Sequence, residues 1–126
     1  MFSHVTIGTG NLERARGFYD AVLAPLGIQR VFNLENGSGW RREGEEGAFW
    51  VGPPFNGAPA VAGNGWMAAF TAPTRAGVDA AHASALAGGG TCEGPPGLRP
   101  HYAADYYGAY ARDPEGNKIH FVCRGD

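Results

Sequence analysis

Four histidines are the residues of this 126-residue chain best suited to metal binding or to proton transfer near neutral pH. His4 lies near the start of the chain and His120 near its end, each within a short β-branched or apolar run. Two imidazoles can hold zinc, nickel, copper or iron weakly while water completes the coordination shell, and His101 is a candidate third ligand. Without a metal, the same side chains can contact a ligand, transfer protons, or hydrogen-bond to each other, to a tyrosine or to water.

Tyrosines form the second group with chemical potential. Tyr102, Tyr106, Tyr107 and Tyr110 fall in one short segment, and strand alternation places Tyr106 and Tyr110 on one face and Tyr107 on the other. We expect one set to line a pocket and the other to pack under a helix. A phenol beside an imidazole can donate a proton or bind an oxyanion, although plain aromatic packing accounts for the cluster equally well.

The elements that must position these side chains can be predicted from periodicity and from turn residues. Asn11 and Thr74 are predicted helix N-caps, and a linker rich in proline, glycine and asparagine covers residues 53–64. His82 falls on the apolar stripe of the second helix, where we expect it to pack in the structure. The predicted helices cover residues 11–26 and 74–87, and the predicted strands cover residues 4–7, 28–34, 39–42, 48–52, 67–70, 106–112 and 118–123.

The second half of the chain repeats the pattern of the first at an offset of half the chain length. At this offset His4 aligns with Met67, Asn11 with Thr74, and the helix-ending Gly27 with Gly90. The repeat predicts two copies of one strand–helix–three-strand unit. We therefore expect one domain over residues 1–126, with a first module of about residues 1–62 and a second of about residues 63–126.

Composition limits the partners and the cellular location that we expect. A net charge of −2 gives no support to nucleic-acid binding or to an anionic membrane surface. Cys92 and Cys123 form no CxxC pair, so we expect two reduced thiols and a cytoplasmic protein. The first residues show no signal-peptide pattern, and the prolines between residues 47 and 74 argue against a membrane span.

Three segments of the chain carry a family resemblance: His4-Val5-Thr6-Ile7, Asn11 to Tyr19, and Asp113 to His120. They resemble the vicinal oxygen chelate superfamily, which includes glyoxalase I, extradiol dioxygenases, fosfomycin-resistance enzymes and bleomycin-resistance proteins. The resemblance covers the whole chain and implies an α+β fold. Two βαβββ modules would form a cup-shaped, barrel-like mixed sheet with the helices outside.

The same resemblance implies a metal site built from the first and the last strand of each module. The corresponding positions here are His4, Trp50, Met67 and His120, where the usual ligands are His, Glu, His and Glu. Tryptophan cannot act as a ligand, and a thioether is a poor ligand for hard divalent metals. We therefore expect a divalent metal (zinc, nickel, iron or manganese) that is weakly held or absent, with His4 and His120 as its ligands.

For function, the resemblance leaves three alternatives open. The chain is a lyase- or dioxygenase-type enzyme with an incomplete metal site, a protein that sequesters a small molecule or antibiotic, or a member with a structural or regulatory role. Glyoxalase I activity is not expected, because both carboxylate positions of the usual site are replaced. The resemblance also implies a homodimer that binds a small oxygenated or aromatic ligand. The catalytic candidates are His4, His120 and Tyr107, and the candidate ligand contacts are Trp50, Met67, His101, Tyr102, Tyr106 and Tyr110.

Overall fold

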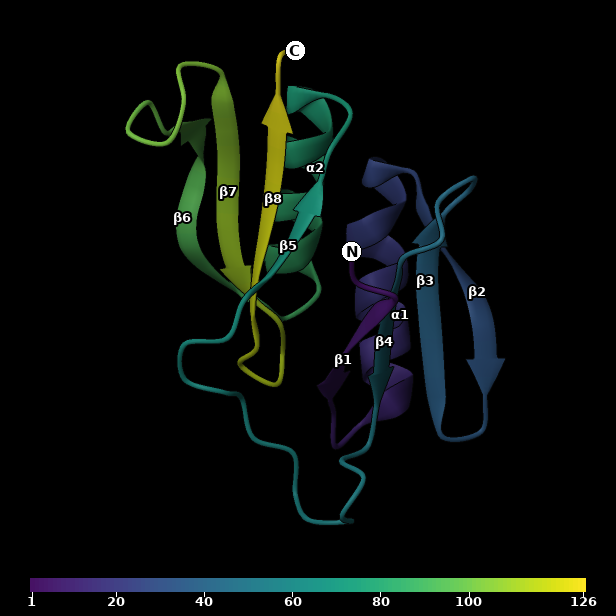
Figure 1. The fold of residues 1–126 in the computed structure, drawn as a ribbon. Helices are drawn as coiled ribbons and strands as arrows, with labels where there is room; N and C mark the ends of the chain where they lie inside the picture. Colours follow the sequence, from purple (N-terminus) through teal and green to yellow (C-terminus); the bar gives the residue numbers. More distant parts are fainter.

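The structure is a computed structural model that describes all 126 residues. Each half of the chain forms one βαβββ module, as predicted, and Figure 1 shows the two modules side by side. The first module consists of β1 (His4–Gly8), α1 (Leu12–Leu23), the 3-10 turn η1 (Ala24–Leu26), β2 (Ile28–Leu34), β3 (Gly37–Arg42) and β4 (Ala48–Gly52). The second consists of β5 (Ala68–Thr71), α2 (Arg75–Ala87), β6 (Thr91–Leu98), β7 (Tyr106–Arg112) and β8 (Lys118–Arg124).

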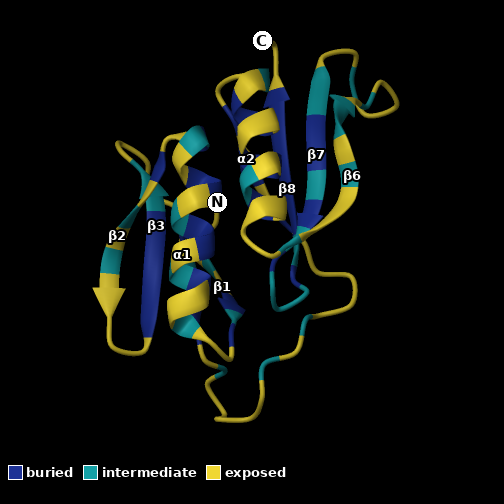
Figure 2. Ribbon diagram, turned by 180° about the vertical axis from the view of Figure 1, so that it is seen from behind, coloured by how far each residue is buried: buried dark blue, intermediate teal, exposed yellow.

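Each module folds into a four-stranded mixed sheet with the same strand order, β1-β4-β3-β2 in the first and β5-β8-β7-β6 in the second. In both sheets the first strand pairs in parallel with the last strand. The sheets are not hydrogen-bonded to each other, so the chain forms two curved sheets and no closed barrel. Both helices lie on the same side of this pair of sheets (Figures 1 and 2).

The predicted helix boundaries are confirmed by their caps. The side chain of Asn11 accepts a hydrogen bond from the backbone of Arg14, and the side chain of Thr74 accepts one from Gly77. These bonds satisfy amide groups that have no partner in the first turn of a helix. Gly27 ends the first helical segment at a φ of 76°, a conformation that favours glycine.

Strand β6 has no counterpart among the predicted segments. Its central residues, from Gly94 to Gly97, are two glycines that enclose two prolines, a composition typical of loops. The strand forms because it lies at the edge of its sheet, where a proline need not donate a ladder hydrogen bond. Its register with β7 shifts twice, which is the irregularity that glycine and proline produce in a strand.

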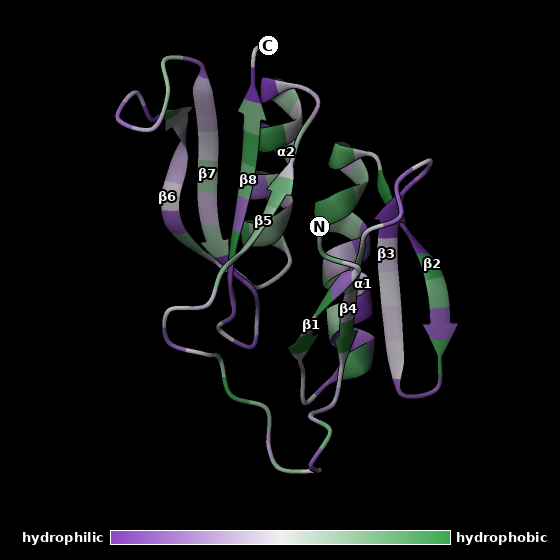
Figure 3. Ribbon diagram, in the orientation of Figure 1, coloured by the Kyte–Doolittle hydropathy of each residue, from purple (hydrophilic) through white to green (hydrophobic).

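The hydrophobic core lies between the sheets and the two helices. Its 22 buried residues come from both modules, and the Phe49 and Phe70 rings meet edge to face at 5.0 Å across the module boundary. Figure 3 shows hydrophobic residues along β5, and Figure 2 shows exposed residues on the side of α1 and α2 that is turned away from the sheets. Each sheet therefore buries one face against a helix, and we call the other its open face. Neither helix has the length and apolar character needed to cross a lipid bilayer.

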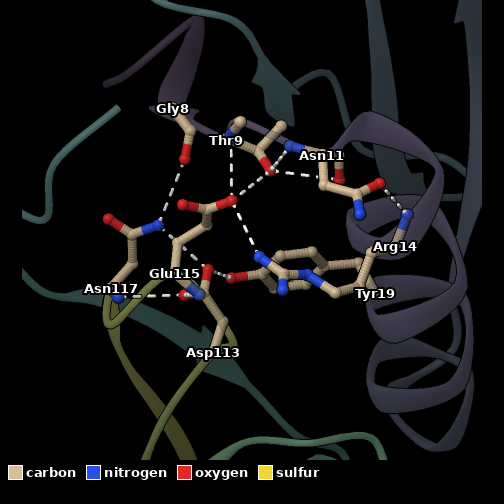
Figure 4. Close-up of polar contacts among 9 residues, drawn as sticks. Gly8, Thr9, Asn11, Arg14, Tyr19, Asp113, Glu115 and Asn117 are labelled. Atoms are coloured by element: carbon tan, nitrogen blue, oxygen red, sulfur yellow. Dashed lines mark hydrogen bonds and ion pairs between the residues drawn. The ribbon is translucent and has the colours of Figure 1, made fainter. Parts of the chain in front are cut away.

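A polar network joins the two modules at one end (Figure 4). The carboxylate of Glu115, in the turn between β7 and β8, accepts hydrogen bonds from the Thr9 hydroxyl at 2.9 Å and from the Gly10 amide at 2.9 Å. It also pairs with Arg14 of α1 at 3.0 Å. The turn of the second module is thus held against the loop that begins the first helix.

Asp113 provides the buried part of the same network. Its carboxylate accepts a 2.6 Å hydrogen bond from the hydroxyl of Tyr19 in α1. It also accepts bonds from the backbone amides of Glu115 and Asn117, both at 2.9 Å, and from the Asn117 side chain at 3.0 Å. The Asn117 side chain in turn reaches the carbonyl of Gly8 at 3.3 Å. One carboxylate therefore shapes the turn and fixes it to the first module.

We expect Glu115→Gln to destabilise the fold by about 1–2 kcal/mol near neutral pH, because charge-assisted hydrogen bonds are lost. Burial alone would raise the pKa of Glu115, but hydrogen bonds from Gly10, Thr9 and Arg14, with the charge of Arg14, lower it below the ordinary 4.5. A lowered pKa stabilises the folded state above pH 4.5 and loses that contribution as the pH falls through the folded value. Urea unfolding from pH 3 to pH 7 should therefore show the difference between wild type and variant shrinking at low pH.

The matched control for this experiment is Glu43→Gln, which removes an exposed carboxylate with no ion pair. It should change stability by less than about 0.5 kcal/mol at every pH. A constant difference between wild type and Glu115→Gln across this pH range would show that the charge of Glu115 does not hold the modules together.

Candidate functional site

The two modules place Trp50 and His120 at equivalent positions. Thr6 of β1 pairs with Trp50 of β4, and Ala69, which aligns with Thr6 in the repeat, pairs with His120 of β8. Alternation along the strands directs both side chains to the open faces, because their neighbours Phe49 and Phe121 belong to the core. The alignment of the modules predicted from the sequence is therefore correct at these two residues.

On the open face of the first sheet, Trp50 stacks on Phe32 with 4.9 Å between the ring centres and 19° between their planes. Both rings lie over Gly39, where an added Cβ would come within 2.8 Å of the indole. The guanidinium of Arg41 lies 5.1 Å from the centre of the Phe32 ring. This face presents an aromatic surface at the position where the family resemblance implies a carboxylate ligand.

On the open face of the second sheet, two tyrosines of β7 lie next to the His120 imidazole. The Tyr110 ring is nearly parallel to the imidazole at 4.0 Å, and the Tyr106 ring is nearly parallel at 5.8 Å. Gly108 lies between these tyrosines in the strand and leaves the room that the imidazole occupies. We call Tyr106, Tyr110 and His120 the tyrosine–histidine face.

Hydrogen bonds determine the protonation state of His120. Its Nδ1 lies 2.8 Å from the carbonyl oxygen of Ala109, which can only accept, so Nδ1 carries the proton. Its Nε2 then accepts from the Tyr106 hydroxyl at 2.7 Å. Burial lowers the pKa of His120, and the charges of Arg99, Lys118 and Arg124 lower it further against the opposing hydrogen bond to Ala109. The imidazole is therefore neutral at pH 7, with both nitrogens engaged.

Tyr107, a catalytic candidate from the sequence, is not brought to this face. Its hydroxyl donates to Asp79 of α2 at 2.6 Å, on the helix side of the sheet. The alternation predicted for the three tyrosines of β7 is confirmed, and it is Tyr106 that contacts His120. His82 also lies on the helix side, where it is 6% exposed and its Nε2 lies 3.3 Å from the Cys92 sulfur, in agreement with the expected packing role.

Most of the predicted ligand contacts of the second module share one cavity of about 310 Å³. His101 packs against Tyr102, whose ring lies 5.0 Å from that of Tyr106. Burial, together with the neighbouring phenols of Tyr102 and Tyr106, raises the pKa of Tyr110 to about 12, so this hydroxyl remains a donor at neutral pH. The cavity is lined by Met67, Glu93, Arg99, His101, Tyr102, Tyr110 and Lys118.

His4 lies elsewhere. It is exposed, its Nδ1 is 2.9 Å from the Ser3 hydroxyl, and it lines a cavity of about 550 Å³ between the modules. Met67 and Trp66 contribute to that cavity, and His120 does not. No three His, Cys, Asp or Glu side chains lie close enough to share a metal ion. The structure thus does not bring His4 and His120 together in one cavity of the chain.

Three residues beside these sites were not identified from the sequence. Lys118 and Arg124 lie on the same side of β8 as His120, and alternation along that strand was the signal that could have revealed them. Phe32, the partner of Trp50, could not be placed this way. A register shift between Arg30 and Phe32 interrupts the alternation of β2.

Known proteins share this fold. Residues 1–121 match the family model described as Glyoxalase/Bleomycin resistance protein/Dioxygenase superfamily. A glyoxalase/bleomycin resistance protein from Albidiferax ferrireducens T118 is 44% identical, with a TM-score of 0.86 and 98% of each chain covered. No curated protein matches the chain.

More distant solved structures share the fold alone. A glyoxalase-related enzyme from Fulvimarina pelagi is 19% identical with a TM-score of 0.75, and the match covers 98% of this chain and 88% of that one. A lactoylglutathione lyase from Agrobacterium tumefaciens is 20% identical with a TM-score of 0.67, covering 98% of this chain and 92% of the other. At such identities the fold can be transferred and the reaction cannot.

Proposed function

The chain belongs to the Glyoxalase/Bleomycin resistance protein/Dioxygenase superfamily, and on that premise we propose that it binds a small oxygenated molecule on the tyrosine–histidine face and transfers a proton there. The observation that carries this proposal is the 2.7 Å hydrogen bond between Tyr106 and a neutral His120 beside a cavity of about 310 Å³. Tyr102 and Tyr110 line that cavity, and the Tyr110 ring stacks on His120.

The donor set does not fit the metal centre that is common in this superfamily. Trp50 cannot bind a metal, and both nitrogens of His120 are already engaged by Ala109 and Tyr106. Met67 lines the inter-module cavity with His4, but a thioether and one exposed imidazole make a poor site for a divalent metal. The proposed proton transfer therefore uses the side chains of this chain and no metal, and glyoxalase I activity is not expected.

Proton transfer would run through Tyr106. Its oxygen donates its own proton to Nε2 of His120 and keeps lone pairs that can accept from a ligand hydroxyl or acidic C–H. As the ligand proton moves to the Tyr106 oxygen, the phenol proton moves to Nε2, and the Ala109 carbonyl stabilises the imidazolium that forms. The phenol of Tyr110 remains a donor for an oxyanion produced on the ligand.

Ligand sequestration without turnover is the second candidate. The observation in its favour is that both aromatic stacks are already assembled in the structure, Trp50 on Phe32 and Tyr110 on His120. Preformed surfaces bind without a large ordering cost. A ligand that binds to wild type and to Tyr106→Phe with equal affinity, and is released unchanged by both, would favour this candidate over the enzyme.

We also propose a homodimer, because several large apolar side chains of the linker and strands are exposed. A second copy can cover such surfaces through a symmetric interface. Sedimentation should give twice the 13.2 kDa chain mass at micromolar concentration. Sedimentation as one 13.2 kDa species over the same range would rule out a stable dimer.

The binding test uses a neutral probe, 4-hydroxybenzamide, followed by two-dimensional amide NMR at pH 7. We expect the largest shift changes at Gly108, Tyr110 and His120, and about tenfold weaker binding in Tyr110→Leu. Phe55→Leu, which changes a fully exposed linker residue, is the control and should bind as wild type does. Absence of binding, or shift changes confined to the helix side, would overturn the proposed site.

A further inference from the structure

The unpaired positive charges of the chain are concentrated at one place. Five of the ten Lys and Arg side chains form ion pairs, which leaves five without a carboxylate partner. Three of these five, Arg99, Lys118 and Arg124, surround the tyrosine–histidine face. Positive charges that lie together and outnumber the nearby carboxylates repel one another, so an incoming anion would be stabilised there.

The aromatic rings determine where these cations lie. The Arg99 guanidinium is 5.6 Å and the Lys118 ammonium 5.2 Å from the centre of the Tyr110 ring. The Arg124 guanidinium is 4.9 Å from the centre of the Tyr106 ring. Each cation is therefore within cation–π distance of a tyrosine that also stacks on the imidazole.

Two of the cations line the cavity and keep donors available. Arg99 is oriented by the carbonyl oxygens of Pro95 at 2.7 Å and Gly97 at 2.9 Å, and the rest of its guanidinium remains free to bind. The Lys118 ammonium makes no hydrogen bond within the chain, so all three of its N–H donors are available. The one carboxylate of the cavity lining, Glu93, is paired with Arg112 and also interacts with the charge of Lys118, so this single negative charge is shared between two cations.

The hydrogen-bonding groups of the face agree with a negative ligand. The Tyr110 hydroxyl is a donor at neutral pH, and His120 carries no charge that would add to the three cations. Charge-assisted bonds from Arg and Lys to carboxylate or phosphate oxygens are stronger than neutral ones, and phenol donors can add to them. A cationic ligand would meet repulsion at the same place.

Resting on the function proposed above, we propose that the ligand of the tyrosine–histidine face carries an oxyanion, a carboxylate or a phosphate, bound by Lys118 and Arg99 with Arg124 beside them. The hydroxyl or other oxygen of the same ligand would then lie toward Tyr106. The substrate class is accordingly a small hydroxylated organic acid or phosphate ester.

The test compares probes that differ in charge and little in shape. Binding of 4-hydroxybenzoate, phenyl phosphate and 4-hydroxybenzamide is measured by amide NMR at pH 7 and low salt. Of the two anions, we expect the one that binds more tightly to have at least about tenfold higher affinity than 4-hydroxybenzamide. Most of this difference in affinity should disappear in about 0.3 M NaCl. The ranking of the carboxylate and the phosphate identifies which oxyanion the face prefers.

Variants locate the charge that is responsible. Lys118→Gln should weaken binding of the preferred anion by about tenfold and leave the affinity for 4-hydroxybenzamide unchanged. Arg75→Gln is the matched control, because Arg75 also lacks an ion pair and lies 5.3 Å from a tyrosine ring, that of Tyr107 on the helix side. The Arg75→Gln variant should bind the preferred anion and 4-hydroxybenzamide as wild type does.

The outcomes separate this inference from the proposed function. If anions and amide bind the face equally, or if Lys118→Gln binds the anion as tightly as wild type, the oxyanion preference is overturned and the proposed function stands. If no probe binds the face, both are overturned. A thermal melt of each variant confirms that it is folded before binding is compared.

Discussion

Asp113→Ala is expected to remove about 3–5 kcal/mol from the free energy of unfolding, because several buried groups lose their partner at once. Asp113 is 5% exposed and Tyr19 is 1% exposed, so water cannot replace the carboxylate. Burial, and then the charge and hydrogen bond of Asp113, raise the pKa of Tyr19 well above 10, so its hydroxyl keeps its proton and needs an acceptor. Domains of this size unfold at a cost of only about 5–15 kcal/mol, so the loss is a large fraction of stability.

Chemical denaturation of wild type, Asp113→Ala and two controls measures this effect. Asp113→Asn keeps an acceptor oxygen of the same shape and should lose less than the alanine variant. Asp105→Ala removes an exposed aspartate from another turn and should stay within about 0.5 kcal/mol of wild type. A loss below about 1 kcal/mol in Asp113→Ala would contradict the role of this carboxylate in joining the modules.

Gly108→Ala is expected to cost about 2–3 kcal/mol and to break the contact between Tyr106 and His120. The added Cβ would lie 2.6 Å from Cε1 of the imidazole and 3.2 Å from the Phe121 carbonyl oxygen. The imidazole has no free direction of movement, because it is 1% exposed, bonded to Ala109 and stacked on Tyr110. The variant should therefore lose stability and 4-hydroxybenzamide binding together.

Gly17→Ala is the control for that substitution, since it adds the same methyl group to an exposed helix position with no heavy atom within 4 Å. It should stabilise the protein by about 0.5–1 kcal/mol, the usual advantage of alanine over glycine in a helix. If Gly108→Ala melts within about 1 °C of wild type and binds the probe normally, the imidazole is mobile and the proposed site is not rigid.

Much of the fold could be predicted because strong local signals agree with each other. Asn11, Thr74 and Gly27 mark helix ends through capping and left-handed geometry. The repeat between the two halves predicted that both modules contain the same strand–helix–three-strand unit. Strand β6 could not be predicted, because its glycines and prolines have loop character and only the edge position in the sheet permits them.

The site could be predicted only in part. Alternation correctly separated Tyr106 and Tyr110 from Tyr107, and the comparison of the two modules correctly aligned Trp50 with His120. The hydrogen bonds of His120 are made with residues of the neighbouring strand, so no local sequence pattern could predict them. The packing of the two modules decides whether His4 and His120 share one cavity, and the sequence could not predict that packing.

The central claim is that His120 is a neutral partner of Tyr106 and not a metal ligand, and imidazole ¹⁵N NMR of the intact protein tests it most directly. We predict a proton on Nδ1 and an accepting Nε2 at pH 7. Because folding lowers the pKa of His120, the ring should stay neutral as the pH falls past the ordinary 6.5, and its protonation at lower pH should destabilise the fold. Equimolar Zn²⁺ should leave its signals unchanged. A ring that titrates at or above pH 6.5, or a Zn²⁺-induced shift of Nε2, would contradict the account.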